Sequence, residues 1–567
     1  MAVENLITEH IDIWTSAVKT KSTSGRGSSK KLELYGVKKL RELILELAVR
    51  GKLVPQNPND EPASFLLQRI SEEKTQLIKE KKITKPKKLP AIKKQDITFA
   101  LPEGWQACYF GDIYSLVYGD NLPKAKRTES GEFLVYGSNG SVGTHNLFSV
   151  GSPCLVIGRK GSAGAINLSD QPCWVTDVAY SLIPPVGISL KYCFLHLQTL
   201  GLDSLGKGIK PGLNRNEANA LVVCIPPSDE QHRIVAKVDE LMALCDQLEQ
   251  QTEASIEAHQ VLVTTLLDTL TNSADADELM QNWARISEHF DTLFTTEESI
   301  DQLKQTILQL AVMGKLVPQD PSDEPAAELL KRIAEEKAQL VKEKKIKKEK
   351  ALPPISEDDK PFELPSGWEW CHLNSLISEM DAGWSPACPP EASPNHETWG
   401  VLKTTAVQSM EYREYENKVL SPSKEPRPQY EVKNGDILIT RAGPKNRVGV
   451  SCLVQTTRPK LMISDKIIRF HLIELGMSNN FVSLCLNAGA TSEYLESSKS
   501  GMAESQMNIS QDKLKMAPIP LPPIREQTLI VKKVEELIDL CDKLKLSLEK
   551  GKHAHLQFTD SVIEQAV

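Results

Sequence analysis

Apolar residues near the end of the chain recur at alternating steps of four and three. The positions are Ile530, Val534, Leu537, Cys541, Leu544 and Leu548, and the same steps occur at Ile234, Val238, Leu241, Cys245 and Leu248. This spacing is typical of the apolar seam of a coiled coil. It predicts two long helices that connect domains through these side chains, and we expect the same residues to bind partner proteins.

A second helical pattern precedes each of these segments. Leu40, Leu43, Ile44 and Leu47 form one apolar helical face. Gly51 is placed to end that helix, and Pro55 prevents its resumption. Asp60 and Pro62 then predict the start of another helix.

The chain contains an internal duplication. Residues 40–83 and 303–346 share 31 identities in 44 positions, and the same offset aligns "LPEGW" at 101–105 with "LPSGW" at 364–368. A closing pair, "IPPSDEQHRIVAKVDELMALCDQLE" and "LPPIREQTLIVKKVEELIDLCDKLK", aligns at a larger offset. Between the matched segments, over 106–212 and 369–506, no continuous similarity exists. A constant frame with variable contents favours a scaffold holding two diversified binding modules over a duplicated enzyme.

The two variable segments are rich in short strand patterns. "SPCLVIGRKGSAGAINL" in the first and "GDILITRAGPKNRVGVSCLV" in the second consist of β-branched runs separated by Gly-rich turns. We therefore expect an α+β protein in which two mixed α/β domains are joined by long antiparallel coiled-coil helices with pseudo-two-fold symmetry. The expected segments are a partly disordered tail (1–35), a helical frame (36–95), the first domain (96–228), a central connector with the repeated frame (229–358), the second domain (359–523) and a final connector helix (524–567).

Composition excludes several classes of protein. The chain of 567 residues has no apolar run long enough to span a membrane, and its first residues lack the pattern of a signal peptide. We expect a cytoplasmic protein. The eleven cysteines include no CxxC pair, so neither a disulfide framework nor a zinc ribbon is expected.

Charge is distributed unevenly. The net charge is −8, but residues 115–215 hold nine Lys and Arg against six Asp and Glu, whereas residues 229–300 hold three against sixteen. The acidic part can face away from an anionic ligand, so the net charge does not exclude nucleic acid. Lysine runs at 74–94 and 337–350 are typical of solvated helix ends and linkers, with phosphate contact as the alternative.

No catalytic motif is present in the sequence. "GRKGSAG" at 158–164 lacks the spacing of a P-loop, and neither HExxH nor GxSxG occurs. The Pro-Pro pairs do not form the Asn/Asp-Pro-Pro-aromatic motif of amino-methylating DNA enzymes. We expect no catalysis by this chain, no metal and no cofactor of its own.

These features together resemble the specificity subunit of Type I DNA restriction-modification systems. The resemblance rests on "LPxGW" before each variable segment, "PP…EQ…I" leading into each heptad helix, and the repeated "LAVxGKLVPQ". It implies two target recognition domains that each read half of a bipartite, asymmetric site in double-stranded DNA. It also implies two modification subunits and two restriction subunits, which would carry S-adenosylmethionine, ATP and Mg.

The order of segments departs from that of other branches of the family, which begin almost directly at the first module. We interpret it as a circular permutation in which the helix near 38–50 packs beside the C-terminal helix. A helix over 525–550 would extend about 39 Å, close to the roughly 34–36 Å between half-sites one DNA turn apart. The helices would thereby set the spacing of the half-sites.

Candidate DNA-binding residues are Lys, Arg, Asn, Gln and aromatic residues near the Gly-rich turns, because Arg and Asn can bind base edges while Lys more often meets phosphate. In the first domain they are Lys124, Lys126, Arg127, Tyr136, Ser138, Asn139, Arg159, Lys160, Lys207, Lys210, Asn214 and Arg215. In the second they are Trp384, Lys403, Arg441, Lys445, Asn446, Arg447, Lys499, Gln506 and Asn508.

Two alternatives remain open. A tandem scaffold that binds proteins or carbohydrates would have no role on DNA, and its behaviour toward duplex DNA would not depend on salt. A self-sufficient DNA enzyme would methylate DNA without a partner.

Overall fold

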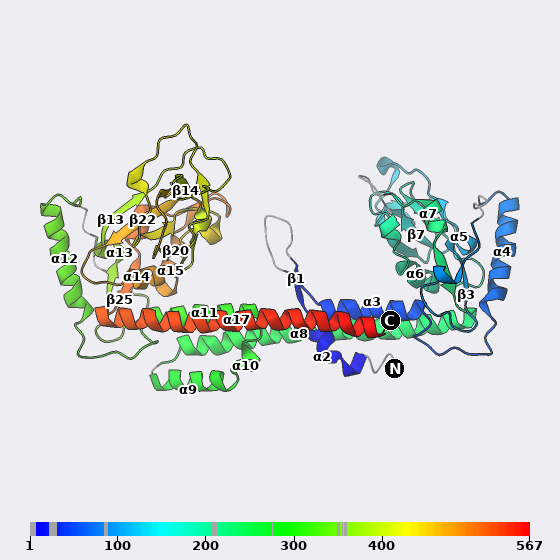
Figure 1. The fold of residues 1–567 in the computed structure, drawn as a ribbon, viewed down its shortest axis with the longest axis horizontal. Coiled ribbons are helices and arrows are strands. Elements are labelled where there is room, and N and C mark those ends of the chain that lie inside the picture. The colour runs from blue at the N-terminus through cyan, green and yellow to red at the C-terminus, as the bar shows by residue number, and fades with distance from the viewer. Residues whose placement is uncertain are drawn as a thin grey trace. The chain divides into compact units, whose positions relative to one another are not determined.

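The computed structural model describes residues 7–21, 31–83, 89–205, 212–274, 276–348, 352–353, 355–356 and 360–566. The chain divides into two compact units (Figure 1). Unit 1 comprises the chain up to Ile256 and the segment from Gly551 onward, and unit 2 runs from Glu257 to Lys550. The long helices α8 (Ser228–Thr271) and α17 (Ile524–Ala566) contribute to both units, so each unit contains the first part of one and the last part of the other.

The long helices exceed the predicted length. They contain 44 and 43 residues, which corresponds to roughly 65 Å at about 1.5 Å per residue, against the predicted 39 Å. The reason is that the apolar seam continues beyond the matched segment. In α8, Val263, Leu267 and Leu270 are buried, and in α17 Val562 is buried.

Helix α3 (Tyr35–Val49) packs against both long helices within unit 1. The Arg41 guanidinium lies 2.7 Å from carboxylates of Asp246 and Glu249 on α8. The Tyr35 hydroxyl donates a hydrogen bond of 2.8 Å to Asp560 on α17. The predicted packing of this helix beside the C-terminal helix is therefore confirmed.

The described part of the N-terminal segment is folded, although disorder was expected in part of it. Helix α2 (Ile11–Ser16) is followed by the strands β1 (Lys19–Lys21) and β2 (Lys31–Glu33), which pair antiparallel. The Trp14 side chain is fully buried, and Ser16 is hydrogen-bonded to His555 at 2.7 Å. Burial of the indole supplies the apolar contact that fixes this segment onto unit 1.

Unit 2 repeats the frame. Helix α11 (Glu297–Val312) matches α3, and α12 (Ala326–Lys342) matches α4 (Ala63–Lys79) of unit 1. Helix α10 (Phe290–Leu293), preceded by α9 (Ala276–Glu288), comes before α11 as α2 comes before α3. Lys304 pairs with Asp542, as Arg41 pairs with Asp246 in unit 1. Figure 1 shows α4 and α12 each standing beside the sheet domain of its own unit.

The phrase "LPxGW" anchors each sheet domain to its frame. Gly51 ends α3 at φ 68°, and a Cβ there would lie 2.5 Å from Pro102; Gly314 does the same at φ 71° against Pro365. Because only glycine accepts both the left-handed backbone and this close contact, the predicted helix end is explained in both copies.

A buried glutamate in each unit also accepts hydrogen bonds from the tryptophan of "LPxGW" and from a glutamine of the frame. The Trp105 indole N–H donates to Glu230 at 3.0 Å, and Gln56 donates to the same carboxylate at 3.2 Å. In unit 2, Trp368 and Gln319 donate to Glu526 at 3.0 and 3.1 Å. Burial raises the pKa of both carboxyl groups, and the hydrogen bonds oppose this shift. The duplicated residues thus make the same contacts twice.

The first sheet domain (residues 106–225) contains a four-stranded sheet in the order β4-β10-β7-β8 and a three-stranded sheet in the order β6-β5-β9. The strands are β3 (Gln106–Tyr109), β4 (Val117–Tyr118), β5 (Phe133–Gly137), β6 (Gly140–His145), β7 (Cys154–Gly158), β8 (Ile166–Ser169), β9 (Cys173–Val175), β10 (Ala179–Leu182) and β11 (Val222–Ile225). The helices are α5 (Phe110–Ile113), α6 (Leu190–Gln198) and α7 (Arg215–Asn219). Strands β3 and β11 pair and bring the domain back to the start of α8.

The second sheet domain (residues 369–521) has the same topology. Its sheets are ordered β13-β22-β18-β20 and β17-β14-β21, and β12 pairs with β25 as β3 pairs with β11. The strands are β12 (Glu369–His372), β13 (Ile377–Ala382), β14 (Gly400–Leu402), β17 (Asn417–Val419), β18 (Ile437–Thr440), β20 (Ser451–Leu453), β21 (Leu461–Met462), β22 (Ile467–Leu472) and β25 (Pro518–Leu521). The matched three-stranded sheets each contain one parallel pair, β5 with β9 and β14 with β21.

The second sheet domain also contains short additional elements. These are the strands β15 (Val407–Gln408), β16 (Glu411–Tyr412), β19 (Ala442–Gly443), β23 (Ser500–Gly501) and β24 (Met507–Asn508), and the helix α15 (Gly489–Ser498). The helices α13 (Leu373–Leu376), α14 (Asn479–Cys485) and α16 (Gln511–Lys515) take the places of α5, α6 and α7 in the order of elements. The predicted α+β class is confirmed. The two domains share an architecture although their sequences show no continuous similarity.

Candidate nucleic-acid interface

A tight turn follows β7 in the first sheet domain and presents two basic residues. Gly158 ends the strand, and a Cβ there would lie 2.0 Å from the Ser162 carbonyl oxygen. Gly161 and Gly164 adopt φ values of 81° and 82°. The glycines of "GRKGSAG" therefore form a compact turn, with Arg159 and Lys160 at its start.

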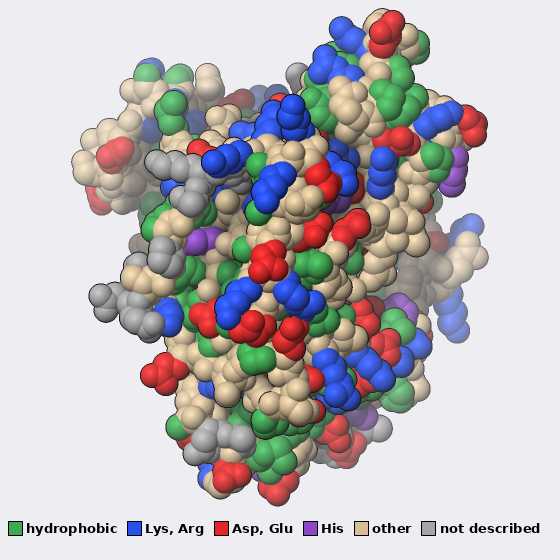
Figure 2. All heavy atoms as spheres, turned by 90° about the vertical axis from the view of Figure 1, so that its left-hand side faces the viewer, with side chains coloured by type: hydrophobic (Ala, Val, Ile, Leu, Met, Phe, Trp, Pro, Cys, Tyr) green, Lys and Arg blue, Asp and Glu red, His purple; other side chains and the backbone are tan. Residues whose placement is uncertain are grey.

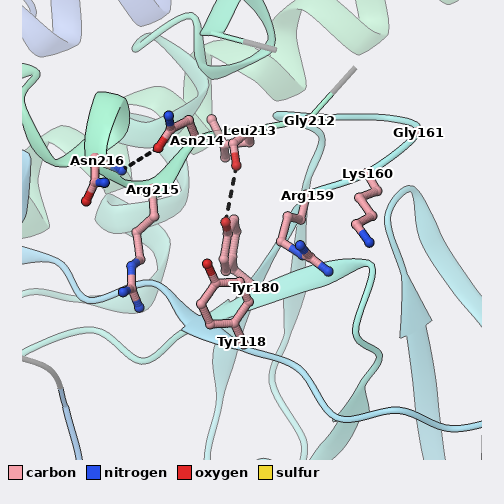
Figure 3. A pocket seen from close by; sticks show the side chains of 10 residues that line it. All are labelled: Tyr118, Arg159, Lys160, Gly161, Tyr180, Gly212, Leu213, Asn214, Arg215 and Asn216. Carbon is pink, nitrogen blue, oxygen red and sulfur yellow. Dashed lines mark hydrogen bonds between the residues drawn. The ribbon is translucent and has the colours of Figure 1, made fainter. Parts of the chain in front are cut away.

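This turn borders an open pocket of about 780 Å³. The pocket is lined by Tyr118, Arg159, Lys160, Gly161, Tyr180, Gly212, Leu213, Asn214, Arg215 and Asn216. Figure 3 shows Tyr118 and Tyr180 at its centre, with Arg159 and Arg215 on opposite sides of them. Four of the predicted residues, Arg159, Lys160, Asn214 and Arg215, are brought together here.

Arg159 is held in a defined orientation. Its Nε and Nη2 atoms both donate to the carbonyl oxygen of Asp177, with an Nε···O distance of 3.0 Å. Its guanidinium carbon lies 5.3 Å from the centre of the Tyr118 ring, a cation–π distance. Among the described residues, none accepts a hydrogen bond from the other N–H groups of this guanidinium.

Arg215 and Asn214 differ in how they are held. Arg215 lies 5.2 Å from the centre of the same Tyr118 ring, without a carbonyl contact like that of Arg159 among the described residues. The Asn214 side-chain oxygen accepts a hydrogen bond of 2.9 Å from the Asn216 backbone and caps α7. The oxygen of Asn214 therefore caps the helix, while its amide nitrogen is free to donate to a ligand.

Tyr118 is a site residue that the sequence analysis missed. It lies on β4, is half exposed, and packs against Tyr180 with ring centres 5.1 Å apart. The buried Tyr180 hydroxyl donates to the Leu213 carbonyl at 3.2 Å, which fixes the ring beneath Tyr118. The only signal in the sequence was an aromatic residue at the end of a short strand pattern, "SLVYG".

The second sheet domain places Arg441 at the position that matches Arg159. Each arginine follows the matched strand, β7 or β18. The carbonyl oxygen of Arg159 accepts from Leu213 N at 2.9 Å, and that of Arg441 accepts from Ile509 N at 2.9 Å. Leu213 and Ile509 each precede the capping residue of a short helix, α7 or α16.

Several predicted residues of the second domain gather near Arg441. Strand β24, which carries Asn508, pairs with β19 directly after Arg441. Gln506 and Asn446 are exposed, and Lys445 lies 3.9 Å from a Glu496 carboxylate. These residues form an exposed polar group around the matched arginine.

A second, smaller pocket of about 340 Å³ lies elsewhere in this domain. Lys403, Lys418 and Lys466 line it together with Ser464 and Asp465. Lys403 also lies 3.6 Å from a Glu416 carboxylate. Near it, the Arg427 guanidinium carbon lies 4.2 Å from the centre of the predicted Trp384 ring. Lys418, Lys466 and Arg427 were not predicted from the sequence.

Two candidates in the second domain are bonded within the fold. The Arg447 guanidinium donates to Gln408 Oε1 at 2.8 Å and to the carbonyls of Thr404 and Val407 at 2.8 and 2.7 Å. The Lys499 side chain is only 6 % exposed and is bonded to Glu496 and to the Lys445 carbonyl. Most donors of these two cations are therefore bonded within the domain, although the buried Arg447 Nε has no hydrogen-bond partner among the described residues. Their contact with DNA stays a prediction.

In the first domain, the side chains of Tyr136 and Arg127 also make contacts within the fold. Tyr136 is 8 % exposed in a small apolar cluster, and Arg127 donates through Nε and Nη2 to the Leu122 carbonyl at 3.2 and 3.0 Å. The burial of Tyr136 leaves little of its ring accessible, and its contact with DNA stays a prediction. Lys124, Lys126 and Asn139 are exposed and Ser138 is half-buried, but none of them lines the pocket. Lys207 and Lys210 lie outside the described residues.

The connector residues face inward within their units. Ile234, Val238, Leu241 and Cys245 are buried in unit 1, and Ile530, Val534 and Cys541 in unit 2, while Leu248, Leu537, Leu544 and Leu548 are partly buried. Their role as a helix seam is confirmed. The binding of partner proteins by these residues stays a prediction.

A buried ionic cluster stabilises the sheet of the second domain. Asp436, which is 1 % exposed, accepts from His471 Nε2 at 2.6 Å and lies 3.6 Å from the Arg469 guanidinium. Arg469 also binds Asp381 at 2.8 Å. The hydrogen bond to Asp436 raises the pKa of His471, with burial opposing this shift.

The surface and the side-chain inventory limit the possible chemistry. On the face drawn in Figure 2, Lys and Arg side chains are interspersed with Asp and Glu, so that face is not uniformly basic. Among the described residues, no group of three or more His, Cys, Asp or Glu side chains could hold a metal ion. Of the helices in the described part of the chain, none is long and apolar enough to span a membrane.

Comparisons with known proteins agree on one family. The model of the Type I restriction modification DNA specificity domain matches residues 102–258 and 407–551. The chain is 53 % identical to the Type I restriction enzyme EcoEI specificity subunit of Escherichia coli, over the full length of both chains. It is 40 % identical, again over both full lengths, to the Type I restriction enzyme EcoAI specificity subunit of the same organism.

Proposed function

Because the chain belongs to the family of Type I restriction modification DNA specificity proteins, we propose that each sheet domain reads one half of a bipartite, asymmetric DNA site. One observation carries the proposal. Two domains without continuous sequence similarity have the same strand order and carry an arginine at the same strand end. Arginine in such a turn can bind guanine edges and phosphates.

The frame supports the use of two such domains together. The backbone of duplex DNA is approximately two-fold symmetric, so two modules related by a pseudo-dyad can dock equivalently. The identical Trp–Glu–Gln groups hold both domains to their frames by the same contacts. Divergent interiors then let the two half-sites differ in sequence.

The partners of the subunit follow from the same proposal. Two modification subunits would bind the duplicated frame and methylate adenine with S-adenosylmethionine, and two restriction subunits would use ATP and Mg. The chain itself would act in the cytoplasm as a non-catalytic reader. The connector helices would fix the distance between half-sites.

The decisive experiment maps methylated adenines genome-wide in cells that express the chain with its modification subunit. The expected result is one motif with two defined halves separated by a constant gap. Exchange of the first sheet domain for that of a relative should change one half only. Methylation without a shared motif, or of two unrelated motifs, would contradict the proposal.

A scaffold for proteins or carbohydrates is the competing function. It predicts no salt-dependent affinity for duplex DNA, whereas a reader that neutralises several phosphates loses affinity steeply as salt rises. Binding of the purified complex to duplex DNA at increasing salt concentrations separates the two. A flat response would favour the scaffold.

A further inference from the structure

The orientation of Arg159 leaves one particular edge of its guanidinium available. A guanidinium can form two parallel hydrogen bonds through the Nε–Nη2 side or through the Nη1–Nη2 end. In Arg159 the Nε–Nη2 side is occupied by the Asp177 carbonyl. The end with Nη1 and the second Nη2 hydrogen is therefore available to a ligand, and no described residue forms an ion pair with it.

Tyr118 restricts the plane of the same group. Its ring lies 5.3 Å from the guanidinium carbon and is itself supported by the buried Tyr180 ring. A side chain held at one edge and on one face has little rotamer freedom left to lose when it binds. This is the arrangement expected for a residue that discriminates bases and differs from that of a flexible phosphate contact.

The chemistry of the free edge selects one base. Two parallel N–H donors match the O6 and N7 acceptors that guanine presents in the major groove. Adenine presents one acceptor and one donor there, so the N–H of its amino group would lie against an N–H of the guanidinium. Cytosine and thymine do not present two adjacent acceptors.

The position of Arg441 provides independent support. It occupies the matched site of the second sheet domain, bonded through its backbone to Ile509 as Arg159 is to Leu213. The residue that matches Tyr118 in strand register is Ala382, so no ring supports Arg441 from there. The arginine is thus common to both domains, whereas the aromatic support belongs to the first.

We propose that Arg159 determines one guanine of the half-site read by the first sheet domain, and that Tyr118 is the residue that positions it. The inference rests on the proposed DNA-reading function. Arg215, which contacts the other side of Tyr118 without a fixed edge, contributes affinity through the DNA backbone and no base preference.

The test uses the complex of the chain with its modification subunit and duplexes that carry the site defined by methylome mapping. Each guanine of the first half-site is replaced in turn by 7-deazaguanine, which lacks the N7 acceptor. The unmodified protein should lose affinity by about 5- to 150-fold at one guanine. The Arg159→Ala variant should bind more weakly and should show no further loss at that guanine.

Matched variants distinguish positioning from stability. Tyr118→Ala should reduce discrimination at the same guanine, and Tyr118→Phe should restore it because the ring is kept. Arg215→Ala should weaken binding to all sequences alike, and Arg441→Ala should leave the first half-site unchanged. A 7-deazaguanine penalty that persists in Arg159→Ala, or relaxed discrimination in Arg215→Ala, overturns the assignment. Failure of the mapping to yield any bipartite motif overturns the proposed function instead.

Discussion

The two sheet domains have the same strand order but different chemistry at matched positions. The second domain places Asp436, Arg469, His471 and Asp381 in its four-stranded sheet. By strand register the first domain has Cys154, Ser181, Ile183 and Val117 there. Cys154 instead contacts Cys173, with 3.7 Å between the sulfur atoms. The comparison shows that strand pairing, and not a particular set of core residues, is common to the two domains.

In the helical frames, by contrast, the residues themselves and their contacts are repeated. The groups Gln56–Trp105–Glu230 and Gln319–Trp368–Glu526 have the same partners at nearly the same distances. These residues hold a buried carboxylate in an apolar setting, so loss of any donor leaves polar atoms unsatisfied. That cost explains why the frame residues are repeated when the domain interiors are not.

The largest expected effect is on the frame. Trp105→Ala should lower the free energy of unfolding of unit 1 by about 3–5 kcal/mol, because it removes a buried indole and a donor to Glu230. Trp368→Ala should do the same in unit 2. Hydrogen exchange followed on peptides of each unit measures both. Unequal effects would show that the matched groups are not equivalent.

The second-largest expected effect is a loss of stability in the second sheet domain when its buried ionic cluster is disrupted. Asp436→Ala should destabilise the second domain by about 3 kcal/mol, because Arg469 and His471 lose a buried partner while Asp381 remains for Arg469. The matched substitution in the first domain, Cys154→Ala, removes no charge partner. Hydrogen exchange of β22 peptides, with β10 peptides as the control, reports the difference.

The same cluster predicts a pH dependence confined to the second domain. The folded-state pKa of His471 is raised, so its contribution is fully present below the unfolded pKa of about 6.5. The contribution is lost as pH rises through the folded pKa. Protection of β22 should therefore decrease above pH 6.5 relative to that of β10. His471→Gln should remove this dependence, and a dependence that survives it would contradict the assignment.

Arg447 offers a sharper contrast with Arg159. Because the Arg447 guanidinium is already bonded to Gln408, Thr404 and Val407, Arg447→Ala should destabilise the second domain by about 1–3 kcal/mol. It should leave the base preference of both half-sites unchanged. Methylome mapping of the variant checks the base preference, and a change at one base would show that Arg447 reads that base.

The smallest effect is expected for the matched ion pairs on the frame helices. Lys304→Ala removes the pair with the exposed Asp542, and Arg41→Ala removes the pairs with Asp246 and Glu249. Each should cost less than about 1 kcal/mol, since such pairs gain little in water and are screened by salt. Thermal unfolding in low and high salt tests this, and a larger loss would indicate that these pairs fix the helix register.

The sequence predicts the helical frame well because its contacts are local or repeated. The apolar steps from Ile530 to Leu544 and the helix-ending Gly51 can be recognised from the order of residues alone. The sequence predicts two mixed α/β domains but not their common strand order, because strands such as β7 and β18 share burial and pairing but few residues. Nor could the sequence distinguish Arg159 from Arg447. That difference depends on carbonyl groups from Asp177 and from Thr404 and Val407, which only the fold brings into contact.

The contact between Tyr35 and Asp560 sets an order of events during synthesis. Unit 1 includes the segment from Gly551 onward, which leaves the ribosome about 295 residues after Ile256. At roughly 5–20 residues per second, the early part waits on the order of 15–60 s for its last helix. Unit 2 has no such delay, since all of its residues are consecutive. The half of the molecule that is made first is therefore the last to be completed.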